Sequence, residues 1–307
     1  MGRVQALIES SGFFDRAYYL ARYPDIAAST FDPFEHYLKH GADENRWPSE
    51  RFDPEFYAAQ CASHSVPPGN CLLHYLTVGR TGGLFATPDE YALYRTGMPI
   101  IDLANRFESW GRDCEFGFVQ RRLGTDPADL FRFSNPTPEA LSRLISSDFA
   151  GFGDKCYVSL DEQTPRREWY VVDHDTKIQR HSHIFEGDMP KDKVEKAARI
   201  WTRMLREKTV TEIASGRKLY VLKTSEDDLT LEAVSEVAKA LRSKGSSWLL
   251  WVEAGAPVGF CDVAMEGLIR ARIDRVCERG LEHQFSLAGW ITVMCQAWNR
   301  ITGQTLF

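Results

Sequence analysis

Residues 14–41 read FDRAYYLARYPDIAASTFDPFEHYLKHG, and residues 52–79 read FDPEFYAAQCASHSVPPGNCLLHYLTVG. The second stretch repeats the first at a constant offset of 38 residues, without insertion or deletion. A period of this length is typical of a small supersecondary unit that buries its apolar face against a copy of itself. The sequence therefore predicts a small all-α helical-repeat domain over residues 1–85. The positions that keep their residue are Phe14-Asp15, Tyr19, Ala21, His36-Tyr37-Leu38 and Gly41.

Each copy is predicted to form a pair of helices. Asp15 stands where a carboxylate would cap the first helix, because the aromatic residues that follow it have helical spacing. Asp32 precedes a proline at the first position of the second helix, and Gly41 is placed to end that helix. Asn70 and Gly79 take the same two positions in the second copy. Stacking the copies would create a core that neither forms alone.

The aromatic residues of the repeat have two interpretations. Helical spacing directs most of them inward, and we expect them to fill the repeat core together with His36 and His74. The alternative is a docking surface for a glycan or a partner, on which exposed tyrosines and Trp47 would stack against sugar rings. A module of this kind positions other molecules rather than catalysing a reaction.

The first copy carries a longer pattern, written in Phe14 to Ala27, Asp32 to Gly41 and Pro48-Ser49. This pattern resembles a helical repeat attached in bacteria to glycosyltransferases and to other proteins of surface-polysaccharide assembly. The resemblance covers residues 13–83. It implies that the partner is a polysaccharide or a glycan-assembly protein.

Composition excludes several classes of protein. The chain has 307 residues, 43% hydrophobic and 26% charged, which is typical of a globular protein. Its net charge of -6 argues against a nucleic acid partner, and no apolar run is long enough for a membrane span. The first residues lack the apolar core of a signal peptide, and the seven cysteines are scattered without CxxC spacing. We expect a cytoplasmic protein, or one released by lysis, without disulfides, metal or cofactor.

The pattern changes after a linker predicted at residues 86–105. Short apolar runs alternate with amphipathic segments, which implies a mostly parallel sheet covered by helices on both faces. The predicted fold class of residues 106–307 is α/β, with three layers and an antiparallel β insert. Strands are predicted at 106–110, 128–133, 218–223, 247–253 and 267–276, and insert strands at 155–160, 168–173 and 178–185. Helices are predicted at 115–123, 138–149, 191–213, 230–243 and 286–302.

Ligands collect at the carboxyl ends of the strands in such sheets. This rule selects side chains that follow the predicted strands, without the help of any motif. Several are cationic, and together they would suit a phosphate, sulfate or uronate group. The candidates for ligand binding are Arg112, Arg132, Asn135, Lys223 and Glu253.

Cys114 is the candidate nucleophile. It follows a predicted strand and precedes a helix, whose dipole would lower the pKa of the thiol. A nucleophilic cysteine needs a base, and His181 and His183 lie two apart on a predicted strand and therefore face the same way. Asp173 or Asp175 could orient an imidazole. The alternatives are an inert core cysteine and a metal held by the two histidines, for which no third ligand is well spaced.

A second resemblance arises at the stretches Ser109 to Arg121 and Asp129 to Phe133. They resemble the opening of an uncharacterised bacterial domain that occurs beside glycosyltransferases, and the pattern continues over residues 106–300. That domain is distantly similar to a family catalogued as papain-like cysteine peptidases. The similarity implies Cys114 as nucleophile and His181 or His183 as base.

Three functions remain open at this point. The leading hypothesis is a bacterial surface-polysaccharide protein that binds or modifies a glycan and uses the repeat as a docking module. The alternative is a cysteine hydrolase or acyltransferase with Cys114 and His181 or His183. The third is a structural adaptor without catalysis. The sequence does not decide whether the chain forms a homo-oligomer.

Overall fold

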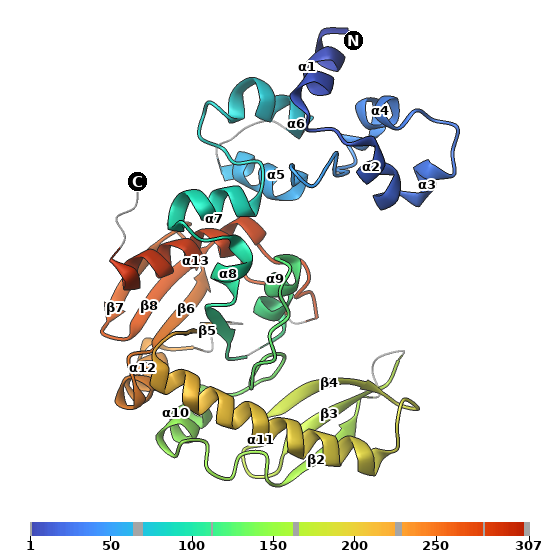
Figure 1. The fold of residues 1–307 in the computed structure, drawn as a ribbon. Helices are drawn as coiled ribbons and strands as arrows, with labels where there is room; N and C mark the ends of the chain where they lie inside the picture. Colours follow the sequence, from blue (N-terminus) through green and yellow to red (C-terminus); the bar gives the residue numbers. More distant parts are fainter. Residues whose placement is uncertain are drawn as a thin grey trace. The chain divides into compact units, whose positions relative to one another are not determined.

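The computed structural model divides the chain into two compact units, Met1–Ile100 and Ile101–Leu306 (Figure 1). It describes residues 2–63, 70–111, 113–161, 166–224, 229–278 and 280–303. The division falls within the predicted linker, residues 86–105. That segment carries two helices, α7 (Pro88–Thr96) and α8 (Ile100–Ala104). Among the described residues, no helix combines the length and the apolar character that crossing a bilayer requires.

Short helices make up the repeat unit, and their first residues are capped as predicted. Asp15 accepts a hydrogen bond from the Tyr18 N–H, and Asn70 accepts one from the Leu73 N–H. The second helix of each copy continues into a π-helical turn that ends at Gly41 or Gly79. The helices are α1 (Gly2–Ser11), α2 (Arg16–Arg22), α3 (Pro24–Ala27), α4 (Pro33–His36), α5 (Pro54–Ser63) and α6 (Cys71–His74).

A tyrosine, a histidine and a glycine meet in each copy. A hydrogen bond of 3.0 Å joins the Tyr19 hydroxyl to His36 Nδ1, and one of 2.6 Å joins the Tyr57 hydroxyl to His74 Nδ1. The same hydroxyl lies against the glycine that ends the π-helical turn, where a Cβ would collide with the oxygen. The interpretation of His36 and His74 as packing residues is confirmed.

Each copy also closes on its own beginning. The Asp15 N–H donates to the Pro48 carbonyl at 2.9 Å, and the Asp53 N–H donates to the Ala86 carbonyl at the same distance. The donor and the acceptor in the second copy each lie one repeat period after their counterparts in the first copy. The sequence repeat is therefore a repeat of contacts as well.

The main sheet of the second unit has the strand order β1-β5-β6-β8-β7. Strands β1, β5, β6 and β8 are parallel neighbours, and β7 pairs antiparallel with β8 at one edge. The prediction of a mostly parallel sheet is confirmed, although β7 was not predicted. The bounds are β1 (Phe107–Ser109), β5 (Leu219–Lys223), β6 (Trp248–Ala254), β7 (Cys261–Met265) and β8 (Leu268–Ile273).

The predicted strand at residues 128–133 is wrong. These residues form an irregular segment that ends in a turn, and Phe133 has a positive φ of 58°. Leu130 and Phe131 are buried, but they fill the core from an irregular segment that needs no strand. The nearest pairing is a single antiparallel bridge between Ser134 and Arg180.

Helices pack against alternate side chains of the main sheet. Tyr220, Leu249 and Trp251 share a buried cluster with residues of α10 (Pro138–Ser146) and α12 (Leu231–Lys244). Phe107 instead contacts Phe116 of α9 (Glu115–Arg122), whose ring lies 5.0 Å from that of Trp290 in α13 (Leu287–Thr302). Because successive side chains point to opposite faces of a strand, these contacts belong to opposite faces.

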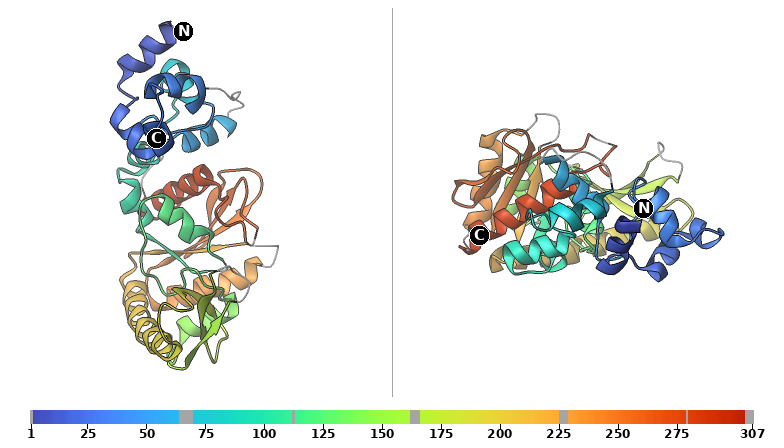
Figure 2. Two further views of the ribbon diagram at one scale, coloured as in Figure 1. Left: turned by 90° about the vertical axis from the view of Figure 1, so that its right-hand side faces the viewer. Right: turned by 90° about the horizontal axis from the view of Figure 1, so that it is seen from above.

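The three insert strands are antiparallel, as predicted, and they form a separate sheet in the order β2-β3-β4. Its strands are β2 (Cys156–Leu160), β3 (Glu168–Asp173) and β4 (Gln179–Phe185). The long helix α11 (Lys191–Ser215), gold in Figure 2, lies beside them. Val158 and Val171 of the sheet pack against Val194 and Ala198 of α11. The opposite face of the insert carries Glu168, Tyr170 and His181.

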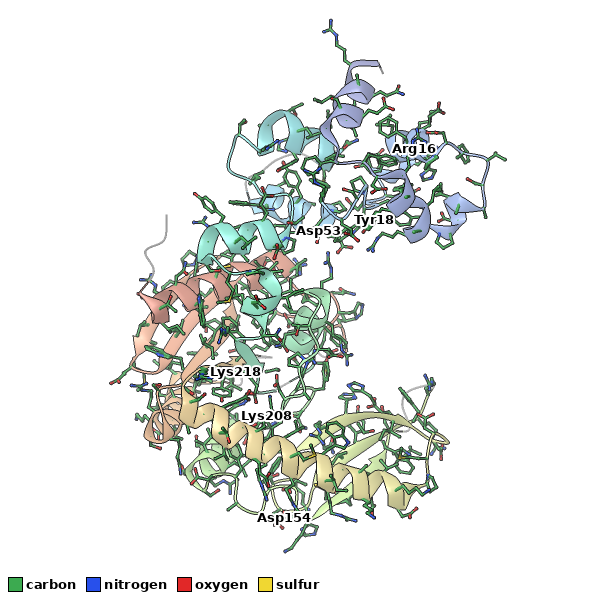
Figure 3. The ribbon with its side chains drawn as sticks, in the orientation of Figure 1. Arg16, Tyr18, Asp53, Asp154, Lys208 and Lys218 are labelled. Carbon is green, nitrogen blue, oxygen red and sulfur yellow. The ribbon has the colours of Figure 1, made fainter. Side chains whose placement is uncertain are left out.

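Strand β1 holds a fully buried acidic side chain. Glu108 Oε1 accepts a hydrogen bond from the Trp110 indole at 3.2 Å, whereas its Oε2 has no partner among the described residues. Burial, and then the neighbouring Asp129, raise the pKa of Glu108 well above its ordinary value. Lys208 of α11, which is labelled in Figure 3, pairs with Asp129 at 2.9 Å.

Candidate functional site

A buried ion network occupies the ends of β1 and β5. Lys223 Nζ lies 2.7 Å from Asp113 Oδ2, and it also donates to the Glu115 carboxylate and to the Cys277 carbonyl. Glu115 accepts two further bonds, from the Cys277 N–H at 2.8 Å and from the Trp290 indole at 2.7 Å. Lys223 is 2% exposed and Glu115 is 0% exposed. Lys223, which the sequence suggested as a ligand-binding residue, is therefore buried and paired with side chains of the protein itself.

The network keeps Lys223 charged. Burial alone would lower the pKa of this amine, but the carboxylates of Asp113 and Glu115 outweigh it and raise the pKa overall. The lysine consequently acts as a structural cross-link between the segment after β1 and the segment after β8.

Cys114 lies directly before α9, as predicted, but its surroundings do not activate the thiol. Burial raises its pKa to about 12, and the nearby carboxylates of Glu282 and Asp113 act in the same direction. Asp113 also accepts the first N–H of the helix, that of Glu115, at 2.9 Å. The lowered pKa expected from the helix dipole is opposite to what these surroundings produce.

The two histidines share one carboxylate. His181 Nδ1 lies 3.0 Å from Glu168 Oε2, and the His183 N–H donates to Glu168 Oε1 at 2.6 Å. The two imidazole rings are stacked with centroids 6.1 Å apart, and the Tyr170 hydroxyl lies 3.4 Å from His181 Nε2. Glu168 is 8% exposed. Burial would raise its pKa, but the bonds from His181 and the His183 N–H lower it overall.

Glu168 is the orienting residue that sequence reasoning missed. The aspartates considered for this role are used elsewhere: Asp173 accepts bonds from Gly153 and Thr176, and Asp175 pairs with His174. A signal for this role was present in the sequence. Antiparallel pairing of the predicted strands 168–173 and 178–185 brings Glu168, at the start of the first, close to the histidines in the later part of the second.

The thiol and the histidines lie in one region but are not joined. Glu168 acts electrostatically on Cys114, and Phe133 packs between Gly117 of α9 and the His183 ring. In the described part of the chain, no hydrogen bond connects the Cys114 sulfur to either imidazole. The arrangement supplies an oriented histidine without a thiol in contact with it.

We expect Cys114 to react slowly with alkylating reagents. A pKa of about 12 leaves little thiolate at neutral pH, so labelling at about pH 8 should be on the order of a thousandfold slower than that of free cysteine. Iodoacetamide labelling followed by peptide mass mapping measures this rate, and Cys114→Ala identifies the peptide. A rate equal to that of free cysteine would contradict the environment described above.

Two further predicted ligand residues serve the structure. Arg132 is buried, pairs with Asp126, and donates to the Gly117 carbonyl at 2.7 Å. Asn135 Oδ1 accepts the Gln179 N–H at 2.8 Å and so fastens its loop to β4. Arg112 lies outside the described residues.

In the repeat unit, Trp47 is half-buried. The Arg22 guanidinium lies 4.7 Å above the Trp47 ring. The backbone N–H of Trp47 donates to the Tyr23 hydroxyl at 2.7 Å. The indole therefore already carries a cation on one face.

Glu253 lies at the carboxyl end of β6 beside an open cavity of about 410 Å³. Arg270 binds both of its oxygens, at 2.9 and 3.0 Å, and Arg272 Nε donates at 2.7 Å. Trp251 and Thr224 complete the nearby wall, with the indole N–H donating to the threonine hydroxyl at 2.7 Å. The cavity thus presents a carboxylate, a guanidinium and a hydroxyl beside an apolar wall.

Comparison of the chain with models of known families, with curated proteins and with solved structures finds no match. Function must therefore be inferred from the geometry. Within the described ranges, no group of three or more His, Cys, Asp and Glu side chains is placed to hold a metal ion.

Proposed function

We propose that the protein binds a saccharide of bacterial surface polysaccharide, in the cavity beside Glu253. The observation that carries this proposal is the composition of that cavity, where Glu253, Arg270 and Thr224 converge at the carboxyl end of a parallel strand. The strand end is the position at which sheets of this class bind ligands. The two resemblances in the sequence point to the same setting.

Sugar hydroxyls both donate and accept hydrogen bonds, and the cavity offers both kinds of partner. The Glu253 carboxylate accepts, the Arg270 guanidinium donates, and the Thr224 hydroxyl does either. Leu229, Leu231 and Val276 supply apolar surface for the C–H faces of a sugar ring. We further propose the three-layer arrangement of the sheet, because helices contact side chains of both of its faces.

The repeat unit is proposed as the docking module for a glycan or a glycan-assembly partner. Its aromatic core is filled by its own side chains, so docking would use the surface around Trp47. We propose a cytoplasmic location, supported by the seven cysteines, which are all free thiols.

Glycan binding tests the proposal. The wild-type chain should bind at least one acidic or neutral surface polysaccharide on a glycan array, and Glu253→Gln should weaken that binding at least about tenfold, because a charge-assisted bond is lost. The matched control is Glu236→Gln, which changes an exposed glutamate of α12. Circular dichroism checks that each variant is folded. Absence of binding by the wild type, or unchanged binding by Glu253→Gln, would refute the proposal.

A second function, that of a cysteine hydrolase or acyltransferase, is favoured by one observation. Glu168 orients His181 as a carboxylate orients the base of a catalytic triad. In this proposal a substrate would bring Cys114 and His181 together and lower the thiol pKa. Labelling of Cys114 in the presence of candidate glycan esters tests it, and a thiol that stays unreactive with every ester would exclude it.

A further inference from the structure

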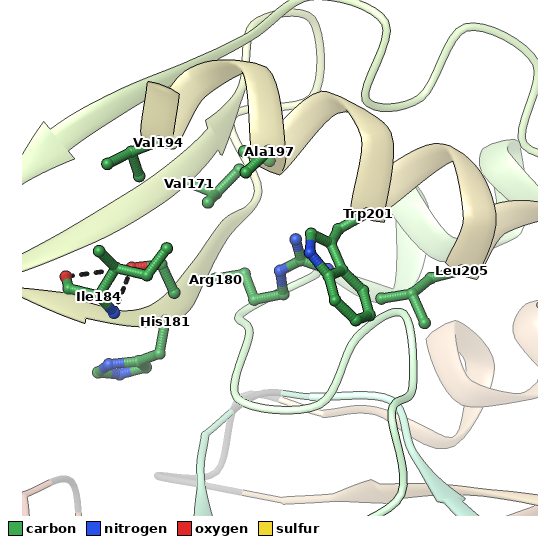
Figure 4. A pocket seen from close by; sticks show the side chains of 10 residues that line it. Val171, Arg180, His181, Ile184, Val194, Ala197, Trp201 and Leu205 are labelled. Atoms are coloured by element: carbon green, nitrogen blue, oxygen red, sulfur yellow. Dashed lines mark hydrogen bonds between the residues drawn. The ribbon is translucent and has the colours of Figure 1, made fainter. Parts of the chain in front are cut away.

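A second cavity lies between the insert and α11, on the face of the sheet opposite to Glu168. It has a volume of about 260 Å³. Its walls are mainly apolar, with side chains from β3, β4 and α11. Figure 4 shows this groove, whose apolar lining includes Val171, Ile184, Val194, Ala197, Trp201 and Leu205.

One cation projects into this groove. Arg180 extends from β4 toward α11, where Trp201 reaches into the same space (Figure 4). Its guanidinium donates to the Thr202 hydroxyl at 3.3 Å. No carboxylate of the described residues pairs with it, and none lines the groove. Two other half-buried or buried arginines of this unit do have such a partner: Arg132 pairs with Asp126 and Arg270 pairs with Glu253.

Arg180 is therefore a desolvated charge without a counter-charge among the residues that the structure describes. Burial lowers the pKa of its guanidinium, which reflects the cost of removing the cation from water. A carboxylate placed beside it would supply the missing charge and would satisfy the remaining N–H donors in the bidentate geometry that arginine favours.

We propose that this groove binds a small apolar carboxylate, with Arg180 holding the carboxylate and the apolar wall holding the hydrocarbon part. The volume of about 260 Å³ lies just below that of a drug-sized site, so the ligand has on the order of ten non-hydrogen atoms. The apolar wall distinguishes this site from the polar cavity beside Glu253. A medium-chain fatty acid or an aromatic acid has the required chemistry.

Octanoate is the probe, and octanamide is the neutral analogue of the same length. Titration calorimetry on the full chain should show octanoate binding, with octanamide at least about tenfold weaker, because only the acid pairs with the guanidinium. Quenching or shift of Trp201 emission, lost in Trp201→Phe, locates the ligand in the groove. Failure of octanoate to bind, or equal binding of the two probes, would overturn the proposal.

Variants add a second line of evidence. Arg180→Met should weaken octanoate binding at least about tenfold, whereas Arg203→Met removes an exposed cation from α11 and should leave binding unchanged. Ala197→Phe fills the groove and should weaken octanoate and octanamide alike. Octanoate bound equally well by the wild type and by folded Arg180→Met would refute the assignment. None of these results depends on whether the chain binds a glycan.

Discussion

Replacing Lys223 with methionine is expected to lower the free energy of unfolding of the α/β unit by about 3–5 kcal/mol. The substitution keeps an unbranched side chain that is one atom shorter, and it leaves Asp113 and Glu115 as buried carboxylates without their shared cation. Urea unfolding followed by tryptophan fluorescence measures the change. All but one of the eight tryptophans belong to this unit, so the signal reports on it.

The matched control is Lys239→Met. Lys239 pairs with Glu236 on the exposed face of α12, and both side chains are more than half exposed. Loss of such a pair should change the free energy of unfolding by less than about 0.5 kcal/mol. Equal effects of the two substitutions would show that Lys223 is not the cross-link described above.

Replacing Glu108 with glutamine is expected to change how stability depends on pH. Burial and Asp129 raise the pKa of Glu108 in the folded state above its ordinary value, so the folded protein binds a proton that the unfolded chain releases. The stabilisation from that proton is complete below the ordinary pKa of about 4.5 and is lost as pH rises toward the folded pKa. Over that window, the wild type should lose up to about 1.4 kcal/mol per pH unit relative to Glu108→Gln.

The glutamine suits the site because it keeps an acceptor for the Trp110 indole and has no charge to bury. The measurement is the difference in unfolding free energy between wild type and variant, determined by urea titration from about pH 5 upward. Glu236→Gln, on the exposed surface, should give a flat difference. A flat difference for Glu108→Gln as well would contradict the raised pKa.

Much of the fold follows from periodicity, and the errors have physical reasons. The first four residues of β5 are apolar because both faces of the strand are buried, and the alternation in α12 matches one buried face. Strand β7 was missed because Asp262, Val263 and Ala264 are exposed and leave no buried stripe. The segment 128–133 was wrongly predicted as a strand because its apolar residues suggested one. Leu130 and Phe131 are apolar because they fill the core, which an irregular segment can also do.

The site was less predictable, because it depends on contacts between distant segments. Cys114 was predicted as an activated thiol beside His181 and His183, but no hydrogen bond joins them among the described residues, and the pKa of the thiol depends on how deeply it is buried. Lys223 looked like a ligand cation, yet its partner Glu115 lies 108 residues away in the chain. Spacing along the sequence cannot reveal such a pairing, nor the absence of one at Arg180.

The closure of each repeat copy sets how the length of this unit can change. The bonds from Asp15 to Pro48 and from Asp53 to Ala86 return the backbone of each copy to its own starting point. Adding or removing one residue inside a copy would displace the donor from its acceptor, whereas adding or removing a whole copy would leave every closure intact. Copy number is thus the quantity free to vary in this unit, and the length of a copy is fixed.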